Sequence, residues 1–165
     1  YPKDRDLDKV FEEELSRVTS QRLWFVADAL RVGWNVERLH QKTFIDPWFL
    51  MQMQSLIQEE IKIAQQSVDQ VTRTDLRRWK SLGFSDALLA KKFQVPEAEV
   101  AKLRRSMGLR PVFKMVDTCA AEFPSETPYF YSTYAQENES IPTDRPKVLI
   151  LGSGPNRTGQ GIEFD

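Results

Sequence analysis

Residues 46–66 predict one long helix, which constrains the fold more than any other part of the chain. Asp46 is a good N-cap and Pro47 a good first helical residue, because the N–H that proline lacks would be unpaired there anyway. At about 100° per residue, one broad apolar arc holds Phe49, Leu50, Met53, Leu56, Ile57, Ile61, Ile63 and Ala64. We expect neighbouring helices to close over so wide a face. Glu60 lies inside the arc, and we expect it to pair with an Arg or Lys and to have no catalytic role.

Caps and glycine stops predict shorter helices on both sides of the long one. An opening helix is expected over residues 7–18. Later helix starts are marked by Thr19 or Ser20, Asn35, Thr74, Ser85 and Pro96, and the stops by Gly33, Gly83 and Gly108. The side chains expected in the core include Leu23, Trp24, Val26, Ala27, Leu30, Trp48 and Phe49. The predicted fold class is mainly α, with an irregular helical domain of about six or seven helices.

An internal repeat is visible at an offset of fifty positions. The matching pairs are Gly33 and Gly83, Asn35 and Ser85, Leu39 and Leu89, Lys42 and Lys92, and Ile45 and Val95. Both copies read as a helix, a glycine stop, a capped short helix, a turn and another helix. Two such units side by side would bury their faces together, although chance similarity of capped helices is the alternative.

After Leu109 the chain changes character, because prolines interrupt any long helix. Residues 111–115 and 129–132 read as extended, which predicts a strap that packs across another part of the protein. The polar, proline-bearing residues 138–146 mark a boundary. The apolar run 147–151 then reads as a single buried β-strand that begins an α/β domain. We therefore predict a helical domain with its strap over residues 1–141 and the truncated start of a second domain over 142–165.

A glycine-rich loop, residues 152–161, follows that predicted strand. A strand, glycines and a helix can bring backbone N–H groups to an anion. The dinucleotide fingerprint would need a glycine where Arg157 stands, and the Gly-Lys-Ser/Thr of a phosphate loop is missing. A tight strand-to-helix turn is therefore an equally good interpretation. Arg157 favours the anion, since a guanidinium holds a carboxylate or phosphate by two bonds.

Bulk composition excludes few functions. The formal net charge of −1 favours no particular partner, and no apolar run is long enough for a membrane span. Residues 1–20 do not resemble a secretory signal, and the single Cys119 fits a reducing compartment. Since the chain begins Tyr-Pro and ends straight after the glycine loop, we expect a fragment of a larger protein. Cys119 and the only histidine, His40, are expected to have packing or surface roles.

Nucleic-acid binding is a second hypothesis. Residues 74–107 contain a pattern similar to a helix-turn-helix, and residues 77–114 hold ten Lys or Arg against three Asp or Glu. A solvated basic face is the commoner meaning of such a run. The proposed recognition helix also places Glu97 and Glu99 where base contacts are normally made. We rank this hypothesis below the next one.

Four segments resemble the large subunit of carbamoyl-phosphate synthetase, in the family's order. They are Ile-Asp-Pro-Trp-Phe-Leu at 45–50, Val-Asp-Thr-Cys-Ala-Ala-Glu-Phe at 116–123, Tyr-Ser-Thr-Tyr at 131–134, and the glycine loop to Asp165. The resemblance implies the helical oligomerisation domain that joins two synthetase halves, followed by the first strand and glycine loop of the second half. It implies no catalytic and no metal-binding residue in this fragment. Loop positions that could line the carbamate route are Asn156, Arg157, Gln160, Gly161 and Glu163.

For the parent protein, the resemblance implies ATP-dependent carbamoyl-phosphate synthesis from bicarbonate and glutamine-derived ammonia, for arginine and pyrimidine biosynthesis. ATP, Mg or Mn and K would be its cofactors. Its partners would be other large subunits and a glutaminase small subunit, in the cytoplasm or the mitochondrial matrix. As an association surface we predict the first helix stripe, Leu7, Val10, Phe11 and Leu15. The alternative is that this stripe packs on the chain's own core.

Overall fold

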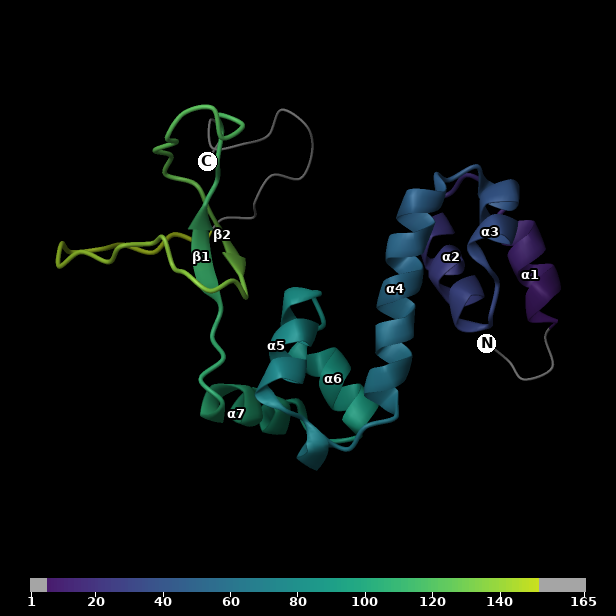
Figure 1. Cartoon of the computed structure of the whole chain (residues 1–165), viewed down its shortest axis with the longest axis horizontal. Helices are drawn as coiled ribbons and strands as arrows, with labels where there is room; N and C mark the ends of the chain where they lie inside the picture. Colours follow the sequence, from purple (N-terminus) through teal and green to yellow (C-terminus); the bar gives the residue numbers. More distant parts are fainter. Residues whose placement is uncertain (1–5, 152–165) are drawn as a thin grey trace.

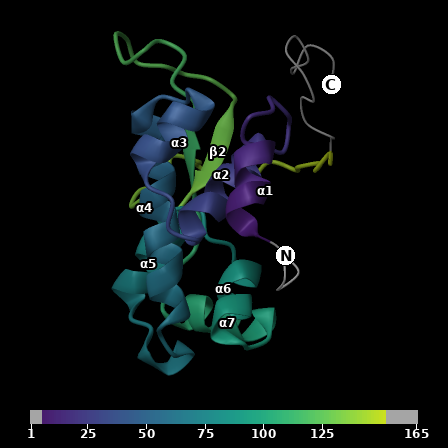
Figure 2. The same ribbon diagram turned by 90° about the vertical axis from the view of Figure 1, so that its right-hand side faces the viewer.

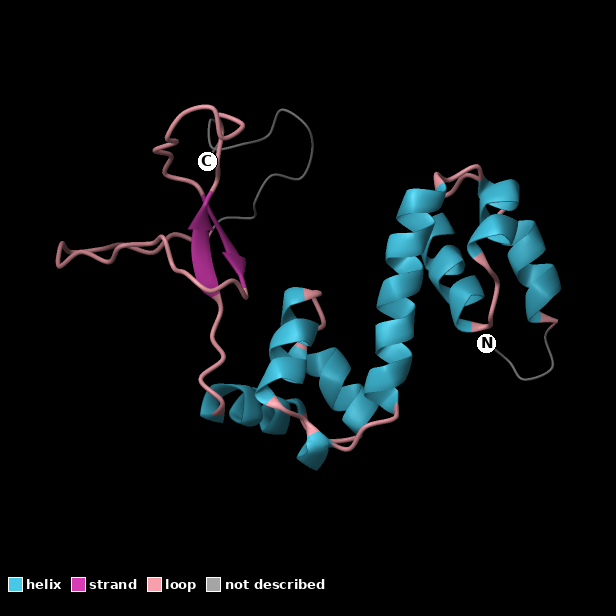
Figure 3. Cartoon of the chain, viewed as in Figure 1, coloured by secondary structure: helices cyan, strands magenta, loops and turns pink. Residues whose placement is uncertain are grey.

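The computed structural model describes residues 6–151 and is mainly helical, as predicted (Figure 1). Its seven α-helices within that range are α1 (Leu7–Glu14), α2 (Arg22–Arg31), α3 (Val36–Thr43), α4 (Pro47–Ala64), α5 (Arg73–Ser81), α6 (Asp86–Phe93) and α7 (Glu97–Ser106). A short 3-10 helix, η1 (Val68–Gln70), precedes α5. The two strands of the described part are β1 (Val112–Met115) and β2 (Phe130–Thr133), drawn in magenta in Figure 3.

Helix α4 is the long helix that the sequence predicts, and it joins two separate cores. The Asp46 side chain caps it by accepting a hydrogen bond from the Trp48 backbone N–H at 2.8 Å. Its first turns enter a core built with α1, α2 and α3, where Leu50 and Ile57 are buried. Its last turn carries Ile63 into a second core built with α5, α6 and α7. Figures 1 and 2 show these two helix groups at opposite ends of α4.

The prediction that neighbouring helices close over the whole apolar arc of α4 is wrong in part. Leu50, Ile57 and Ile63 are buried and Met53 is half-buried. The exposed members of the arc are Phe49, Leu56, Ile61 and Ala64, and Trp48 beside it is exposed as well. The reason is that each helix group covers only one end of α4. A different sector of the helix is therefore buried at each end.

The internal repeat is confirmed as a repeat of structure. Gly33 and Gly83 both have positive φ, 99° and 91°, and end the first helix of each unit. Asn35 and Ser85 then cap the next helix, each accepting from a backbone N–H three residues on, at 2.8 and 3.0 Å. Residues fifty positions apart also fill equivalent core places: Val26 and Leu76, Trp34 and Phe84, Leu39 and Leu89, and Leu50 and Val100. The first unit is α2, α3 and the start of α4, and the second is α5, α6 and α7.

The predicted extended segments form a two-stranded antiparallel sheet. Val112 pairs with Thr133 and Met115 with Phe130. The other edge of β1 is hydrogen-bonded to Asn138 and Glu139 rather than to a third strand, and the Glu139 backbone N–H donates to the Phe113 carbonyl at 2.8 Å. Asn138 accepts from the Phe113 N–H at 2.8 Å, and Glu139 accepts from the Met115 N–H at 2.7 Å. This pairing satisfies an edge that would otherwise be open to another chain.

Residues 147–151 are not a strand, contrary to the sequence prediction. A buried parallel strand needs hydrogen-bonding neighbours. None of residues 6–151 pairs with this run, and Val148 and Leu151 are 89% and 87% exposed. The boundary at residue 142 stays a prediction.

Candidate functional site

Two neighbouring carboxylates on α4 are buried, and one of them, Glu60, connects the two units. Glu60 accepts from the Arg31 guanidinium of the first unit at 2.8 Å and lies 2.6 Å from the Lys92 amine of the second. Burial raises the pKa of the Glu60 carboxyl, but the hydrogen bonds from Lys92 and Arg31 outweigh it and leave the pKa below its usual value. Neighbouring Glu59 accepts from Arg78 at 2.7 Å and from the Trp79 indole at 3.1 Å. The structural pairing predicted for Glu60 is confirmed.

A groove of about 250 Å³ lies beside Glu60, between α2 and α4 on one side and the turn from α5 to α6 on the other. Its polar lining comes from Arg31 and Glu60, which are paired to each other. Its apolar lining comes from Ala27, Met53, Leu56, Ile57, Leu82, Phe84 and Leu88. The groove is thus mainly apolar, and its two charged side chains neutralise each other. Such a groove is better suited to burial against another surface than to binding an ion.

Exposed aromatic side chains continue this groove along α2 and α4. Trp24 is 70% exposed, and Phe49 is 58% exposed with its ring at 4.9 Å and nearly perpendicular to that of Trp48. Positions three and four apart on a helix share a face, so Leu23 and Trp24 lie one turn before Ala27, and Phe49 one turn before Met53. We define the α2–α4 apolar strip as Leu23, Trp24, Phe49, Met53 and Leu56. Exposed apolar surface of this kind marks interaction sites.

Arg22, the first residue of α2, helps to position the two helices that carry the strip. The Arg22 guanidinium donates to the Leu15 carbonyl at 3.0 Å and to the Thr43 carbonyl at 3.0 Å. It therefore ties the beginning of α2 to the end of α3, just before α4 begins. Both acceptors are backbone carbonyls, so Arg22 fixes the start of α2 relative to the main chain that leads into α4.

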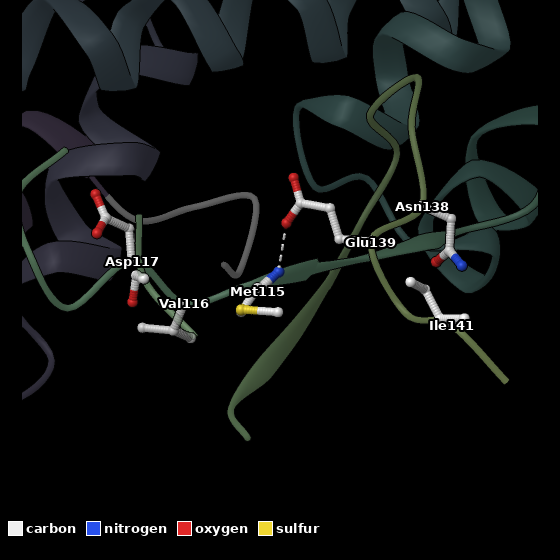
Figure 4. A pocket seen from close by; sticks show the side chains of 7 residues that line it. Met115, Val116, Asp117, Asn138, Glu139 and Ile141 are labelled. Carbon is white, nitrogen blue, oxygen red and sulfur yellow. Dashed lines mark hydrogen bonds between the residues drawn. The ribbon is translucent and has the colours of Figure 1, made fainter. Parts of the chain in front are cut away.

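A second concavity, of about 530 Å³, lies against the strap (Figure 4). Its polar groups are already used. Glu139 binds the Lys114 amine at 2.6 Å and the Met115 N–H, and Asn138 donates to the Ser140 carbonyl at 2.7 Å. The Asp117 carboxylate accepts from the N–H groups of Cys119 and Ala121 at 2.9 and 2.7 Å. The polar groups of this pocket therefore stabilise the fold of the strap itself.

Comparison with known proteins gives the family. The family described as "carbamoyl-phosphate synthetase large chain, oligomerisation domain" matches residues 2–108. The chain belongs to this family. It is 49% identical over 164 residues to the carbamoyl phosphate synthase large chain of Neisseria meningitidis serogroup B, covering 99% of this chain and 15% of that protein. The large chain of Pseudomonas aeruginosa is 45% identical over 162 residues, 98% of this chain and 15% of the relative. The chain thus spans about 15% of the relatives' length.

The first-helix stripe lies largely inside the oligomerisation domain's own core. Phe11 and Leu15 are fully buried, and the Phe11 ring packs edge-on against Trp34 at 6.0 Å. Leu7 packs against the same core and Val10 is half-buried. For Phe11 and Leu15, packing on the chain's own core is the interpretation that fits. Contact of Leu7 or Val10 with a partner stays a prediction.

The predicted loop residues Asn156, Arg157, Gln160, Gly161 and Glu163 lie outside the described residues. Their proposed role along a carbamate route stays a prediction. Within residues 6–151 there is no group of three or more His, Cys, Asp or Glu that could hold a metal. In the same range, no helix combines the length and apolar character needed to cross a membrane. The His40 Nδ1–H donates to the Ile45 carbonyl at 2.8 Å, which is a packing role.

The basic stretch of the nucleic-acid hypothesis is partly neutralised inside the fold. Lys80 and Arg104 both pair with Asp86 at 2.8 Å, and Lys92 pairs with Glu60. The first turn of α7 carries Glu97 and Glu99, as the sequence indicated. This arrangement leaves fewer cations for phosphate contacts than the sequence count suggests.

Sequence reasoning missed the α2–α4 apolar strip by placing Leu23, Trp24 and Phe49 in the core, whereas all three are exposed. A signal was present. Leu23 to Ala27 are five consecutive apolar residues, and they extend around more of the helix than one packed face can bury.

Proposed function

We propose that this chain is a non-catalytic helical scaffold within a longer carbamoyl-phosphate synthase large chain, and that it self-associates through the α2–α4 apolar strip. The observation that carries the proposal is the oligomerisation-domain match over residues 2–108, together with that exposed strip in the same range. A second copy of the chain is the proposed occupant, because the family is described by its oligomerisation. The parent would make carbamoyl phosphate from bicarbonate and glutamine-derived ammonia with ATP.

The finer parts of this proposal depend on the resemblance alone. They are the use of ATP, Mg or Mn and K by the parent, a glutaminase small subunit, service of arginine and pyrimidine synthesis, and a cytoplasmic location. In the same way, residues 1–141 would be the oligomerisation domain and 142–165 the start of the following synthetase half. The loop candidates from Asn156 to Glu163 would line the carbamate route only in that complete context.

Sedimentation velocity over a concentration series tests the self-association. We expect the chain to form a larger species that the double variant Trp24→Ser, Phe49→Ser loses, because the two largest exposed side chains of the strip are removed. Phe123→Ser is the matched control, since Phe123 is also 70% exposed but lies on the strap. A chain that stays monomeric at every concentration, or a double variant that associates like the control, would overturn the proposed surface.

The scaffold role has its own test. The purified chain is expected to show no ATP turnover in the presence of bicarbonate and ammonia, measured by phosphate release. Turnover that follows the chain through purification would contradict the non-catalytic part of the proposal.

A further inference from the structure

A third concavity, of about 450 Å³, lies where α5, the turn after α7 and the strap meet. Its lining includes three arginines, Arg73, Arg77 and Arg110, together with Tyr134 and Gln136. The arginines come from α5 and from the segment that leads into β1, so the fold brings them together from positions more than thirty residues apart. Its volume lies within the range of small-molecule sites, about 300–1,000 Å³.

The positive charge of this pocket is not balanced within the described part of the chain. Arg73 uses its Nε to donate to the Met107 carbonyl at 3.0 Å, which fixes that side chain at the rim. The side chains of Arg77 and Arg110 form no ion pair or hydrogen bond with any of residues 6–151. None of the described residues that line the pocket is acidic. By contrast, the nearby cations Lys80 and Arg104 are both paired with Asp86.

The walls of the pocket are fixed by groups outside it. Arg104 donates to the Leu109 carbonyl at 3.1 Å, and Ser81 donates to the Tyr134 carbonyl at 3.4 Å. The first bond anchors the segment before β1 to α7, and the second anchors the strap to α5. The arginines therefore lie around a preorganised hollow, and this lowers the ordering cost of binding.

We propose that this pocket binds the phosphate group of a small phosphate ester or diphosphate. A guanidinium fork matches both carboxylate and phosphate oxygens. A phosphate group carries about two negative charges at neutral pH, which balances both unpaired arginines, whereas a single carboxylate balances one. The remaining volume beside Tyr134 and Gln136 accommodates the rest of the ligand. This site is separate from the α2–α4 apolar strip, and the proposal does not depend on self-association.

Isothermal titration of the full chain with inorganic pyrophosphate tests the site, with the dicarboxylate succinate as the comparison ligand. Arg77→Ala and Arg110→Ala are each expected to weaken pyrophosphate binding by at least about tenfold, since each removes a charge-assisted contact. Arg77→Lys keeps the charge but loses the guanidinium fork, so its affinity for pyrophosphate should lie between those of Arg77→Ala and the unsubstituted chain. Arg105→Ala is the matched control, because it removes the same charge from α7 outside the pocket and should change affinity by less than about twofold.

Three results would overturn the proposal. These are binding of pyrophosphate no tighter than succinate, equal affinity in the Arg77→Ala and Arg105→Ala variants, or no heat of binding at about 10 mM pyrophosphate. Circular dichroism of each variant checks that the fold is retained. Arg77 is half-buried, so Arg77→Ala could fail to fold. Arg110 is exposed, and Arg110→Ala therefore still tests the site in that case. The sedimentation coefficients of the same variants should match those of the unsubstituted chain.

Discussion

Asp86 occupies a place that is apolar in the other unit. At the offset of fifty, Lys80 and Asp86 correspond to Leu30 and Val36. The second unit thus replaces an apolar contact with a buried ion triad, in which Asp86 binds Lys80 and Arg104 at 2.8 Å each. The three side chains are only 8–15% exposed. Breaking such a group leaves charges buried without compensation.

Asp86→Asn is therefore expected to lower the free energy of unfolding by about 3 kcal/mol, measured by urea denaturation. Glu13→Gln is the control, because its pair with Arg17 is more than half exposed on both sides and should change stability by less than about 1 kcal/mol. Equal effects of the two substitutions would show that the triad adds nothing beyond a surface pair.

Acid should destabilise the chain through the same carboxyl group. Burial raises the pKa of Asp86, but the hydrogen bonds from Arg104 and Lys80 outweigh it, so the pKa lies below its usual value. A lowered pKa in the folded state stabilises the fold above the unfolded value, about 3.9, and that stabilisation is lost as the pH falls through the folded pKa. Urea midpoints measured from pH 6 down to pH 2.5 should fall below about pH 4. The fall should be shallower in Asp86→Asn, and an identical profile in that variant would contradict this assignment.

Residue-level chemistry was only partly predictable from the sequence. The pairing of Glu60 followed from a carboxylate within an apolar arc, because burial of a charge demands a partner. Glu59, which is also buried, was not predicted. Its burial depends on the second helix group reaching the last turns of α4, and no local pattern records that arrangement.

At the scale of elements, the repeat was predictable because its signals are local. A glycine with positive φ and a capping residue two positions later determine the same turn wherever they occur. The burial of α4 was not predictable in this way. Amphipathic spacing shows which residues share a face, but only tertiary packing decides which part of that face is covered.

Gly83→Ala tests the backbone requirement of the repeat. A Cβ at Gly83 would meet no atom within 4 Å, so steric contact with neighbours is excluded as a cause of destabilisation. The φ of 91° remains unfavourable for alanine, and we expect a loss of about 1 kcal/mol in the free energy of unfolding. Gly33→Ala, at φ 99°, should cost a similar amount.

The opposite change provides the check on that backbone argument. Gln94 ends α6 at φ 58° without being glycine, so Gln94→Gly should leave stability unchanged or raise it. A loss in Gln94→Gly as large as the loss in Gly83→Ala would show that something other than left-handed backbone strain controls these turns.

At the scale of the whole molecule, α4 makes two units behave as one. The units have separate cores, and α4 passes through both. Glu60 is the point where the first unit, through Arg31, and the second, through Lys92, bind the same side chain. Cooperative unfolding of two cores requires an interface whose loss costs free energy, and this shared carboxylate supplies part of it.

Glu60→Ala should therefore separate the two units thermally. The substitution leaves Arg31 with Asp28 and leaves Lys92 without its partner on α4, while both apolar cores stay intact. Differential scanning calorimetry is expected to show one unfolding transition for the unsubstituted chain and two resolved transitions for Glu60→Ala. Glu37→Ala is the control, because Glu37 is an exposed carboxylate on α3 within the first unit and contacts Gln41 rather than the second unit. A single transition in Glu60→Ala, shifted only in temperature, would mean that α4 itself couples the cores and that the ion pairs merely add stability.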